Sequence, residues 1–116
     1  MNNYNVVMEI DDNKKWYHLL ERIENLKKFP EVSENVNVIA SDTAVLTYLN
    51  NTELECIRTQ MEKLSEKNVH FFICTNTLKK YGIARERLLP FVKFAEQGAI
   101  VEVLKLQDDG YKYIKI

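Results

Sequence analysis

The chain has 116 residues, which is enough for one hydrophobic core and too few for two. Its composition, 46% hydrophobic and 28% charged with only 3 Gly and 2 Pro, argues against disorder. The formal net charge of −1, from 16 basic and 17 acidic side chains, gives no general attraction for nucleic acid or for anionic membranes. We therefore predict a single domain over residues 1–116 that binds no nucleic acid.

The first half of the chain alternates between strand and helix patterns. Residues 4–10 predict a strand, and the polar residues after it can cap a helix whose apolar side chains recur at helical spacing: Trp16, Leu19, Leu20, Ile23 and Leu26. Residues 27–35 contain Pro30 and predict a loop, and residues 36–40 predict a second strand. Ser41 and Asp42 can then start another helix, which extends through Leu49.

The second half continues the alternation. Thr52 and Glu55 have the spacing of a capping box for a helix that ends near residue 67, and Cys56 on it is interpreted as a packing residue. Residues 69–73 predict a third strand, residues 75–82 a helix, and residues 92–95 a fourth strand. Gly98 precedes a helix-like stretch whose β-branched residues keep a strand as an alternative, and residues 111–116 predict a final strand.

Strands that alternate with helices imply a mostly parallel sheet of about five strands, covered on both faces. In such sheets the carboxyl ends of the strands form the functional crevice. Polar residues follow three of the predicted strands, namely Asp11 to Asn13, Ser41 to Thr43, and Cys74 to Thr77. We take Asp12, Ser41, Thr75, Asn76 and Thr77 as candidate binding residues, while helix capping alone is the competing explanation for each set.

Cys74 is the candidate active thiol because it stands where the third predicted strand gives way to a helix. Unpaired amides and the positive end of the helix dipole stabilise a thiolate at such a position, and the thiolate is the nucleophilic form. We therefore expect Cys74 to be more nucleophilic than Cys56. The alternative is a buried structural cysteine, since free cysteine is among the most buried residue types.

The sequence gives little support for a membrane span, a bound cofactor or a metal site. No apolar run approaches the ~20 residues that span a bilayer, and the first five residues lack the features of a signal peptide, so we expect a cytoplasmic protein with no membrane partner. No glycine-rich phosphate loop follows the first strand, and the two cysteines match no zinc or disulfide pattern. We therefore expect no cofactor and no metal.

The segment Cys74-Thr-Asn-Thr-Leu-Lys-Lys-Tyr-Gly-Ile83, placed after the third strand of an alternating chain, resembles the DsrE/DsrF-like family. The likeness extends to Leu88-Leu-Pro-Phe, to Gly98 before an apolar stretch, and to Gly110-Tyr-Lys-Tyr-Ile114, as in the small uncharacterised branch of that family. The resemblance implies a three-layer, flavodoxin-like α/β sandwich. It also implies a homo-oligomer, either a trimer or a hexamer.

In the sulfur-relay members of this family, the cysteine after the third strand takes up a sulfane sulfur as a persulfide and passes it to a partner protein. By position this residue is Cys74, so the resemblance implies a persulfide carrier or sulfurtransferase-like protein with donor and acceptor proteins as partners. The chain departs from the relay members in having Thr75-Asn76-Thr77 after the cysteine and Tyr81 before Gly82. The alternative is a noncatalytic oligomeric module that binds a small ligand or regulates a partner.

Overall fold

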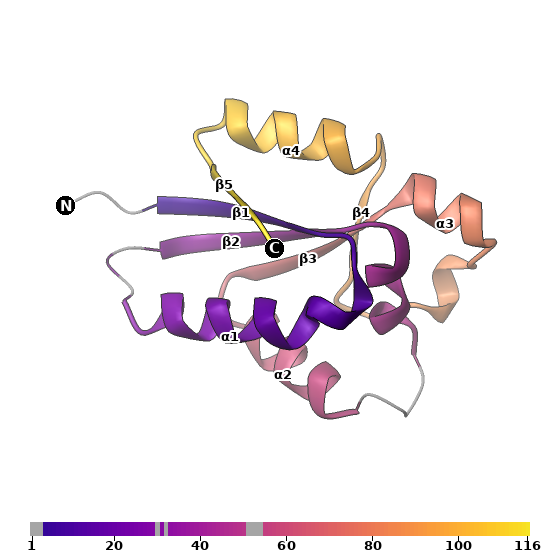
Figure 1. Cartoon of the computed structure of the whole chain (residues 1–116), viewed down its shortest axis with the longest axis horizontal. Helices are drawn as coiled ribbons and strands as arrows, with labels where there is room; N and C mark the ends of the chain where they lie inside the picture. The colour runs from indigo at the N-terminus through magenta and orange to yellow at the C-terminus, as the bar shows by residue number, and fades with distance from the viewer. Residues whose placement is uncertain (1–3, 30, 32, 51–54) are drawn as a thin grey trace.

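The computed structural model describes residues 4–29, 31, 33–50 and 55–116 of the chain. Within them, five strands form one sheet in the order β4-β3-β2-β1-β5, and every neighbouring pair is parallel (Figure 1). The strands are β1 (Tyr4–Ile10), β2 (Ser33–Ala40), β3 (Val69–Cys74), β4 (Lys93–Ala95) and β5 (Lys112–Lys115). The predicted α/β fold with a parallel sheet of about five strands is confirmed.

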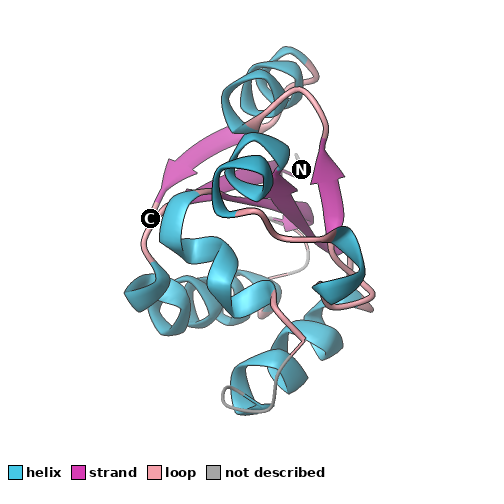
Figure 2. Cartoon of the chain, turned by 90° about the vertical axis from the view of Figure 1, so that its right-hand side faces the viewer, coloured by secondary structure: helices cyan, strands magenta, loops and turns pink. Residues whose placement is uncertain are grey.

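The helices are divided unequally between the two faces of the sheet (Figure 1). Helices α1 (Trp16–Lys27) and α2 (Glu55–Ser65) cover one face, and α4 (Ala99–Asp108) lies on the other. Figure 2 looks toward the ends of the strands and shows helices on both sides of the twisted sheet. Helix α3 (Thr75–Tyr81) and three short 3₁₀ helices complete the described elements: η1 (Asn13–Lys15), η2 (Asp42–Tyr48) and η3 (Arg85–Arg87).

The larger core lies on the face that α1 and α2 cover. Alternate strand residues point into it, and Trp16, Tyr48 and Phe71 form its aromatic centre, with ring centroids between 5.3 and 6.4 Å apart. The indole of Trp16 donates a hydrogen bond to the carbonyl of Ala44 at 2.9 Å, which satisfies the buried N–H. The periodic apolar pattern therefore correctly predicted α1, the helix that packs Trp16 against the sheet.

A smaller core lies under α4. It consists of Val7, Ile39 and Cys74 from the sheet together with three residues of the helix, Ala99, Val103 and Leu106. Because strand side chains alternate between faces, Cys74 points away from the Phe71 side of β3 and toward α4. The alternation of side chains along β3 thus determines that the thiol packs against α4.

Several predicted boundaries differ from the structure. β2 begins at Ser33, within the predicted loop, because its parallel pairing with β1 extends to Tyr4. The helix predicted after Ser41 is a 3₁₀ helix that ends at Tyr48. The stretch after Gly98 is a helix, so the strand alternative is wrong there: its apolar side chains Ala99, Val103 and Leu106 pack as a helical stripe. Thr52 of the predicted capping box lies outside the described residues.

The interpretation of Cys56 as a packing residue is also wrong. Cys56 is exposed on α2, whose buried residues are Ile57, Met61 and Leu64. Those three residues recur at intervals of three and four, and Cys56 falls one position before the stripe, about 100° around the helix. Sequence proximity to a core residue is therefore no guide to burial on a helix.

Candidate functional site

Cys74 is the last residue of β3, and α3 begins at the next residue. Its side chain is only 5% exposed. As the N-cap residue of α3, Cys74 has an extended backbone, and its side chain makes no capping hydrogen bond to that helix. The Cys74 thiol is therefore able to accept a hydrogen bond from a residue outside α3.

The group that contacts the thiol belongs to α4. The backbone N–H of Ala99 donates a hydrogen bond to Sγ of Cys74 at a distance of 3.3 Å. Ala99 is the first residue of this ten-residue helix, so the donor is one of the amides that have no partner within the helix. The dipole of α4 adds a partial positive charge at the same place, and both effects favour a negatively charged sulfur.

Thr75 holds the chain that connects β4 to α4. Its hydroxyl Oγ1 lies 3.0 Å from the carbonyl oxygen of Ala95 and 3.1 Å from that of Glu96, and its single proton is shared between these two acceptors. We call residues 96–98 the β4–α4 turn. Since the Thr75 side chain is buried and engaged in this way, it positions the turn beside Cys74 and leaves the sulfur to the Ala99 amide.

Asn76 lies against the same turn. Gly98 has φ +94°, and a Cβ at this position would stand 2.6 Å from Nδ2 of Asn76. The Asn76 side chain is exposed, in contrast to the buried Thr75 and Cys74. Asn76 is thus the exposed member of the three polar residues that follow Cys74. It lies next to Gly98, the residue that precedes Ala99.

Thr77 points elsewhere. It is buried, and its Oγ1 accepts a hydrogen bond from the backbone N–H of Asp42 at 3.2 Å. Asp42 has a positive φ of 49°, which few residues other than glycine adopt readily. The contact fixes α3 to the end of β2 and gives Thr77 a structural role.

The polar residues after β1 and β2 mainly bond to one another. Oδ1 of Asp12 accepts a hydrogen bond from the N–H of Lys14 at 2.9 Å, as expected for a cap of η1. Thr43 bridges the two strand ends, accepting from the N–H of Asn13 at 3.1 Å. Ser41 stands at the N-cap of η2 without a side-chain capping bond. Within the described part of the chain, neither Asp12 nor Ser41 is hydrogen-bonded to residues 74–77.

An ion pair joins the β4–α4 turn to η3. Arg85 of η3 donates two hydrogen bonds to the carboxylate of Glu96, at 3.1 and 2.7 Å, and its guanidinium stacks over the ring of Phe94 at 4.3 Å. The hydrogen bonds from Arg85 lower the pKa of Glu96 below its usual value. Both side chains of this pair are exposed, so the pair lies on the outer side of the β4–α4 turn.

The sequence pattern alone does not point to the Ala99 amide, to Arg85 or to Glu96. Gly98 followed by an apolar helical stretch was the available signal for the amide. The order of strands was also needed, because β4 must lie next to β3 before the start of α4 can reach Cys74. Arg85 and Glu96 carry no local pattern that distinguishes them from other surface charges.

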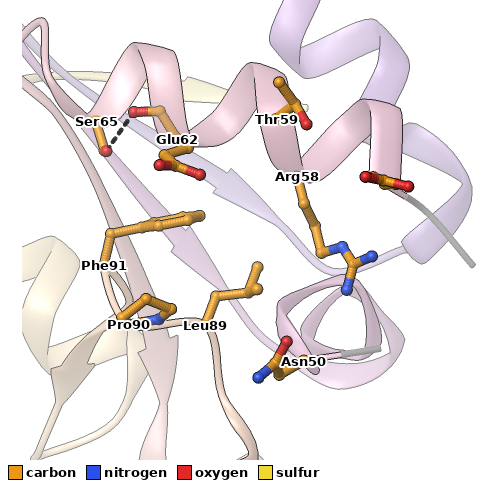
Figure 3. A pocket seen from close by; sticks show the side chains of 9 residues that line it. Asn50, Arg58, Thr59, Glu62, Ser65, Leu89, Pro90 and Phe91 are labelled. Carbon is orange, nitrogen blue, oxygen red and sulfur yellow. Dashed lines mark hydrogen bonds between the residues drawn. The ribbon is translucent and has the colours of Figure 1, made fainter. Parts of the chain in front are cut away.

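A separate groove of about 540 Å³ lies between α2 and residues 89–91 (Figure 3). Arg58 and Asn50 stand at one end of it, and Phe91 forms part of the opposite wall. It opens on the face that α1 and α2 cover, whereas Cys74 belongs to the α4 face. Among the described residues, no three His, Cys, Asp or Glu side chains gather closely enough to hold a metal ion, and no helix is long and apolar enough to cross a membrane.

The fold and the position of its thiol define the class of protein: a small parallel α/β domain with a cysteine at the carboxyl end of the third strand, hydrogen-bonded to a helix start. The chain belongs to the DsrE/DsrF-like family, whose pattern matches residues 8–116. No curated protein gives a significant match.

Three solved structures resemble the chain over nearly its whole length. A protein of unknown function, MTH1491 from Methanobacterium thermoautotrophicum, is 25% identical with a TM-score of 0.85, covering 97% of this chain and 99% of that one. The ychN protein of E. coli is 17% identical with a TM-score of 0.77, over 97% and 99% of the two chains. BT1422 from Bacteroides thetaiotaomicron, a conserved protein of unknown function, is 14% identical with a TM-score of 0.69, over 97% and 94%.

Proposed function

We propose that this protein is a sulfur carrier in which Cys74 accepts a sulfane sulfur and holds it as a persulfide. The hydrogen bond from the Ala99 amide to Sγ is the observation that supports this function best. An amide at a helix start stabilises the thiolate that must attack the donor. Membership in the DsrE/DsrF-like family is consistent with sulfur relay.

The proposed transfer needs no oxidant or reductant beyond the donor. The Cys74 thiolate attacks the terminal sulfur of a persulfide on a donor protein, and a new bond forms between the two sulfurs. The bond between the terminal sulfur and the donor's own sulfur breaks, and the donor departs as a thiolate. The reverse reaction on an acceptor thiol releases the sulfur atom, so the protein requires partner proteins and is not a complete enzyme alone.

The surroundings of Cys74 suit a reactive sulfur that must persist between partners. Val7, Ile39 and Val103 are buried around it, together with Ala99. Exclusion of water by such apolar side chains limits side reactions of a bound intermediate. Polar groups approach from the turn, where Asn76 lies next to Gly98 at the surface. We propose Thr75 and Asn76 as the residues that shape the site.

We also propose that the chain forms a homo-oligomer, a trimer or a hexamer, through the outer surface of α4. This helix is the only one on its face of the sheet among the described residues, and Ile100 and Leu104 on it are 73% and 59% exposed. A groove of about 210 Å³ lies between these residues and Tyr113 of β5. A second copy that covered this surface would bury apolar area that is otherwise hydrated.

A noncatalytic binding module is the second candidate. The groove between α2 and residues 89–91 has a volume within the ~300–1,000 Å³ typical of ligand sites. Its wall combines the guanidinium of Arg58 with the apolar surface of Leu89 and Phe91 (Figure 3). In this alternative, Cys74 is a packing residue of the α4 core, and the ligand binds on the opposite face.

Intact-mass analysis after exposure to a sulfane-sulfur donor separates the two functions. The Cys56→Ser variant, which retains Cys74 alone, should gain the mass of one sulfur atom, about 32 Da, and lose it on reduction. The Cys74→Ala variant retains the exposed Cys56 and serves as the matched control for nonspecific loading. Loading confined to Cys56, with several donors, would contradict the sulfur-carrier function and leave the binding module.

A further inference from the structure

The β4–α4 turn runs directly beside the thiol of Cys74. At one end of the turn, Ala95 pairs with Cys74 in the parallel sheet, and at the other the N–H of Ala99 reaches Sγ. The hydroxyl of Thr75 bonds to the carbonyls of Ala95 and Glu96 between these points. The turn thus closes the end of the smaller core, in which the Cys74 thiol is only 5% exposed although it lies at the carboxyl end of its strand.

This burial conflicts with the chemistry proposed for the residue, because a sulfur that exchanges with a partner protein must be reached by that partner's thiol. The conflict is removed if a local segment can move without unfolding the domain. The β4–α4 turn has the properties of such a segment. It is short, Glu96 and Gln97 are exposed, and Gly98 has the positive φ that permits a change of direction.

We infer that the β4–α4 turn is a movable cover over Cys74, and that the ion pair between Arg85 and Glu96 is the latch that holds it closed. Arg85 belongs to η3, and Glu96 belongs to the turn, so the pair joins the turn to a different element. Both side chains are about half exposed, at 49% and 62%, so a partner protein can compete for either charge without entering the core.

The strength of the latch fits a cover that opens often. Exposed ion pairs stabilise a protein only weakly, so loss of this pair should change the opening equilibrium by no more than roughly fivefold. The two hydrogen bonds of the pair, at 3.1 and 2.7 Å, give it bidentate geometry, and the stacking on Phe94 orients the guanidinium. Loss of the pair should therefore expose Cys74 more often while leaving the core of the domain intact.

The inference deepens the proposed function, since it concerns access to the same thiol, but its test uses no sulfur donor. In the Cys56→Ser background, the rate at which iodoacetamide alkylates Cys74 reports how often the sulfur is reached. Arg85→Gln and Glu96→Gln should each raise this rate about two- to fivefold at constant pH. Asp11→Asn, which removes a comparable exposed ion pair with Lys115 on the far strand β5, is the matched control and should leave the rate unchanged.

The two latch variants also separate access from thiol chemistry. Removal of the negative charge of Glu96 favours the thiolate and speeds alkylation, whereas removal of the positive charge of Arg85 disfavours it and slows alkylation. Rates that change in opposite directions would therefore show an electrostatic effect alone and overturn the latch. Unchanged alkylation rates in both variants would also overturn the latch.

Global unfolding provides the remaining route to a buried thiol, and denaturant titration of each variant measures it. For a latch, the increase in alkylation rate in Arg85→Gln and Glu96→Gln should exceed the increase in the unfolding equilibrium constant. If the rates of all variants, Asp11→Asn included, follow the unfolding constant, the cover does not move independently and the inference is wrong. If the latch variants are alkylated faster but no sulfur is loaded, the sulfur-carrier function is contradicted, while the inference of a movable cover still holds.

Discussion

The amide of Ala99 and the sulfur of Cys74 are hydrogen-bonded at 3.3 Å although 25 positions separate the two residues along the chain. The contact exists because β4 lies beside β3 at the edge of the sheet and delivers the start of α4 to the end of β3. A helix start that is remote in sequence therefore supplies the stabilisation that the sequence pattern assigned to the helix directly after the cysteine.

Cys74→Ser should retain the fold and lose the sulfur loading assigned to Cys74. The serine oxygen can accept the hydrogen bond from Ala99, but it cannot form a persulfide. Its hydroxyl proton enters apolar surroundings, and an unsatisfied buried donor costs about 1–3 kcal/mol, so the melting temperature should fall by several degrees. Circular dichroism and intact-mass analysis test the two parts, with Cys74→Ala as the control that lacks the polar group. Loading of the serine variant at the wild-type level would show that another residue is the acceptor.

Cys56 should be alkylated before Cys74 in the folded protein, which reverses the order expected from the sequence. Cys56 is exposed on α2, whereas Cys74 is buried, and a small alkylating reagent reacts only with a sulfur that it can reach. Peptide mapping after brief labelling at neutral pH should place the first modification on Cys56, and denaturant should make both cysteines react. Preferential labelling of Cys74 in the native state would mean that the β4–α4 turn is open for most of the time.

The fold could be predicted from the sequence because its main elements have clear periodic patterns. The stripe from Trp16 to Ile23 and the apolar run from Val69 to Ile73 each match the structure. Position along the chain was enough to place Cys74 at a strand end. The surroundings of its sulfur depend on strand order and on side-chain alternation, which place the thiol under α4 and beside Ala99.

The polar residues after the strands were harder to interpret because one side-chain type serves two purposes. Asp12 caps η1, and Thr77 accepts from the backbone of Asp42 at the end of β2, so both satisfy backbone N–H groups and neither approaches the thiol. Thr75, with the same chemistry as Thr77, instead holds the β4–α4 turn beside Cys74. Only the directions of the side chains distinguish these roles, and they follow from the three-dimensional path of the chain.

Gly98→Ala should destabilise the domain more than Gly82→Ala. Gly98 has φ +94° and ψ 167°, a region that is almost exclusive to glycine, and the expected loss is about 1–3 kcal/mol. Gly82, at φ +63° and ψ 34°, occupies the milder left-handed helical region, with nothing within 4 Å of an added Cβ. Its replacement should cost about 1 kcal/mol, the lower end of the penalty for a Cβ in the left-handed helical region.

Chemical denaturation of the two glycine variants measures the difference. Adding Asn76→Ala to Gly98→Ala removes the side chain nearest the new Cβ. Because Asn76 is exposed and its amide can swing aside, the second substitution should restore little stability. A full recovery would assign the loss to this contact instead of to the backbone of Gly98.

Leu104→Glu should dissociate the proposed homo-oligomer without unfolding the chain. Leu104 is exposed on α4, so the monomer tolerates the charge, but a carboxylate inside an apolar interface lacks water and a partner. Tyr17→Glu on α1 is the control, since Tyr17 is also an exposed hydrophobic residue and belongs to the other face. Light scattering at high micromolar concentration should find the wild type and the control as oligomers and Leu104→Glu as a monomer. A monomeric wild type would contradict the assembly.

The attachment of β5 should weaken at alkaline pH through Tyr113. Burial, together with the hydrogen bond that its hydroxyl donates to Glu9, raises the pKa of Tyr113 from 10.0 to about 12. Since the folded state holds this proton more tightly than the unfolded state does, the stabilising contribution is complete below pH 10. It then declines as the pH rises from 10 to 12. The hydroxyl connects β5 to β1 at the edge of the sheet, so its ionisation places a negative charge beside the Glu9 carboxylate.

Denaturant titrations between pH 8 and pH 12 compare the wild type with Tyr113→Phe, which keeps the ring and lacks the hydroxyl. The difference in the free energy of unfolding between the two proteins should be constant up to about pH 10 and should shrink above it. Tyr48, whose pKa burial also raises, is present in both proteins, as are the lysines, so their ionisation cancels in the difference. A difference that stays constant up to pH 12 would mean that the Tyr113 hydroxyl does not hold β5 to Glu9 in solution.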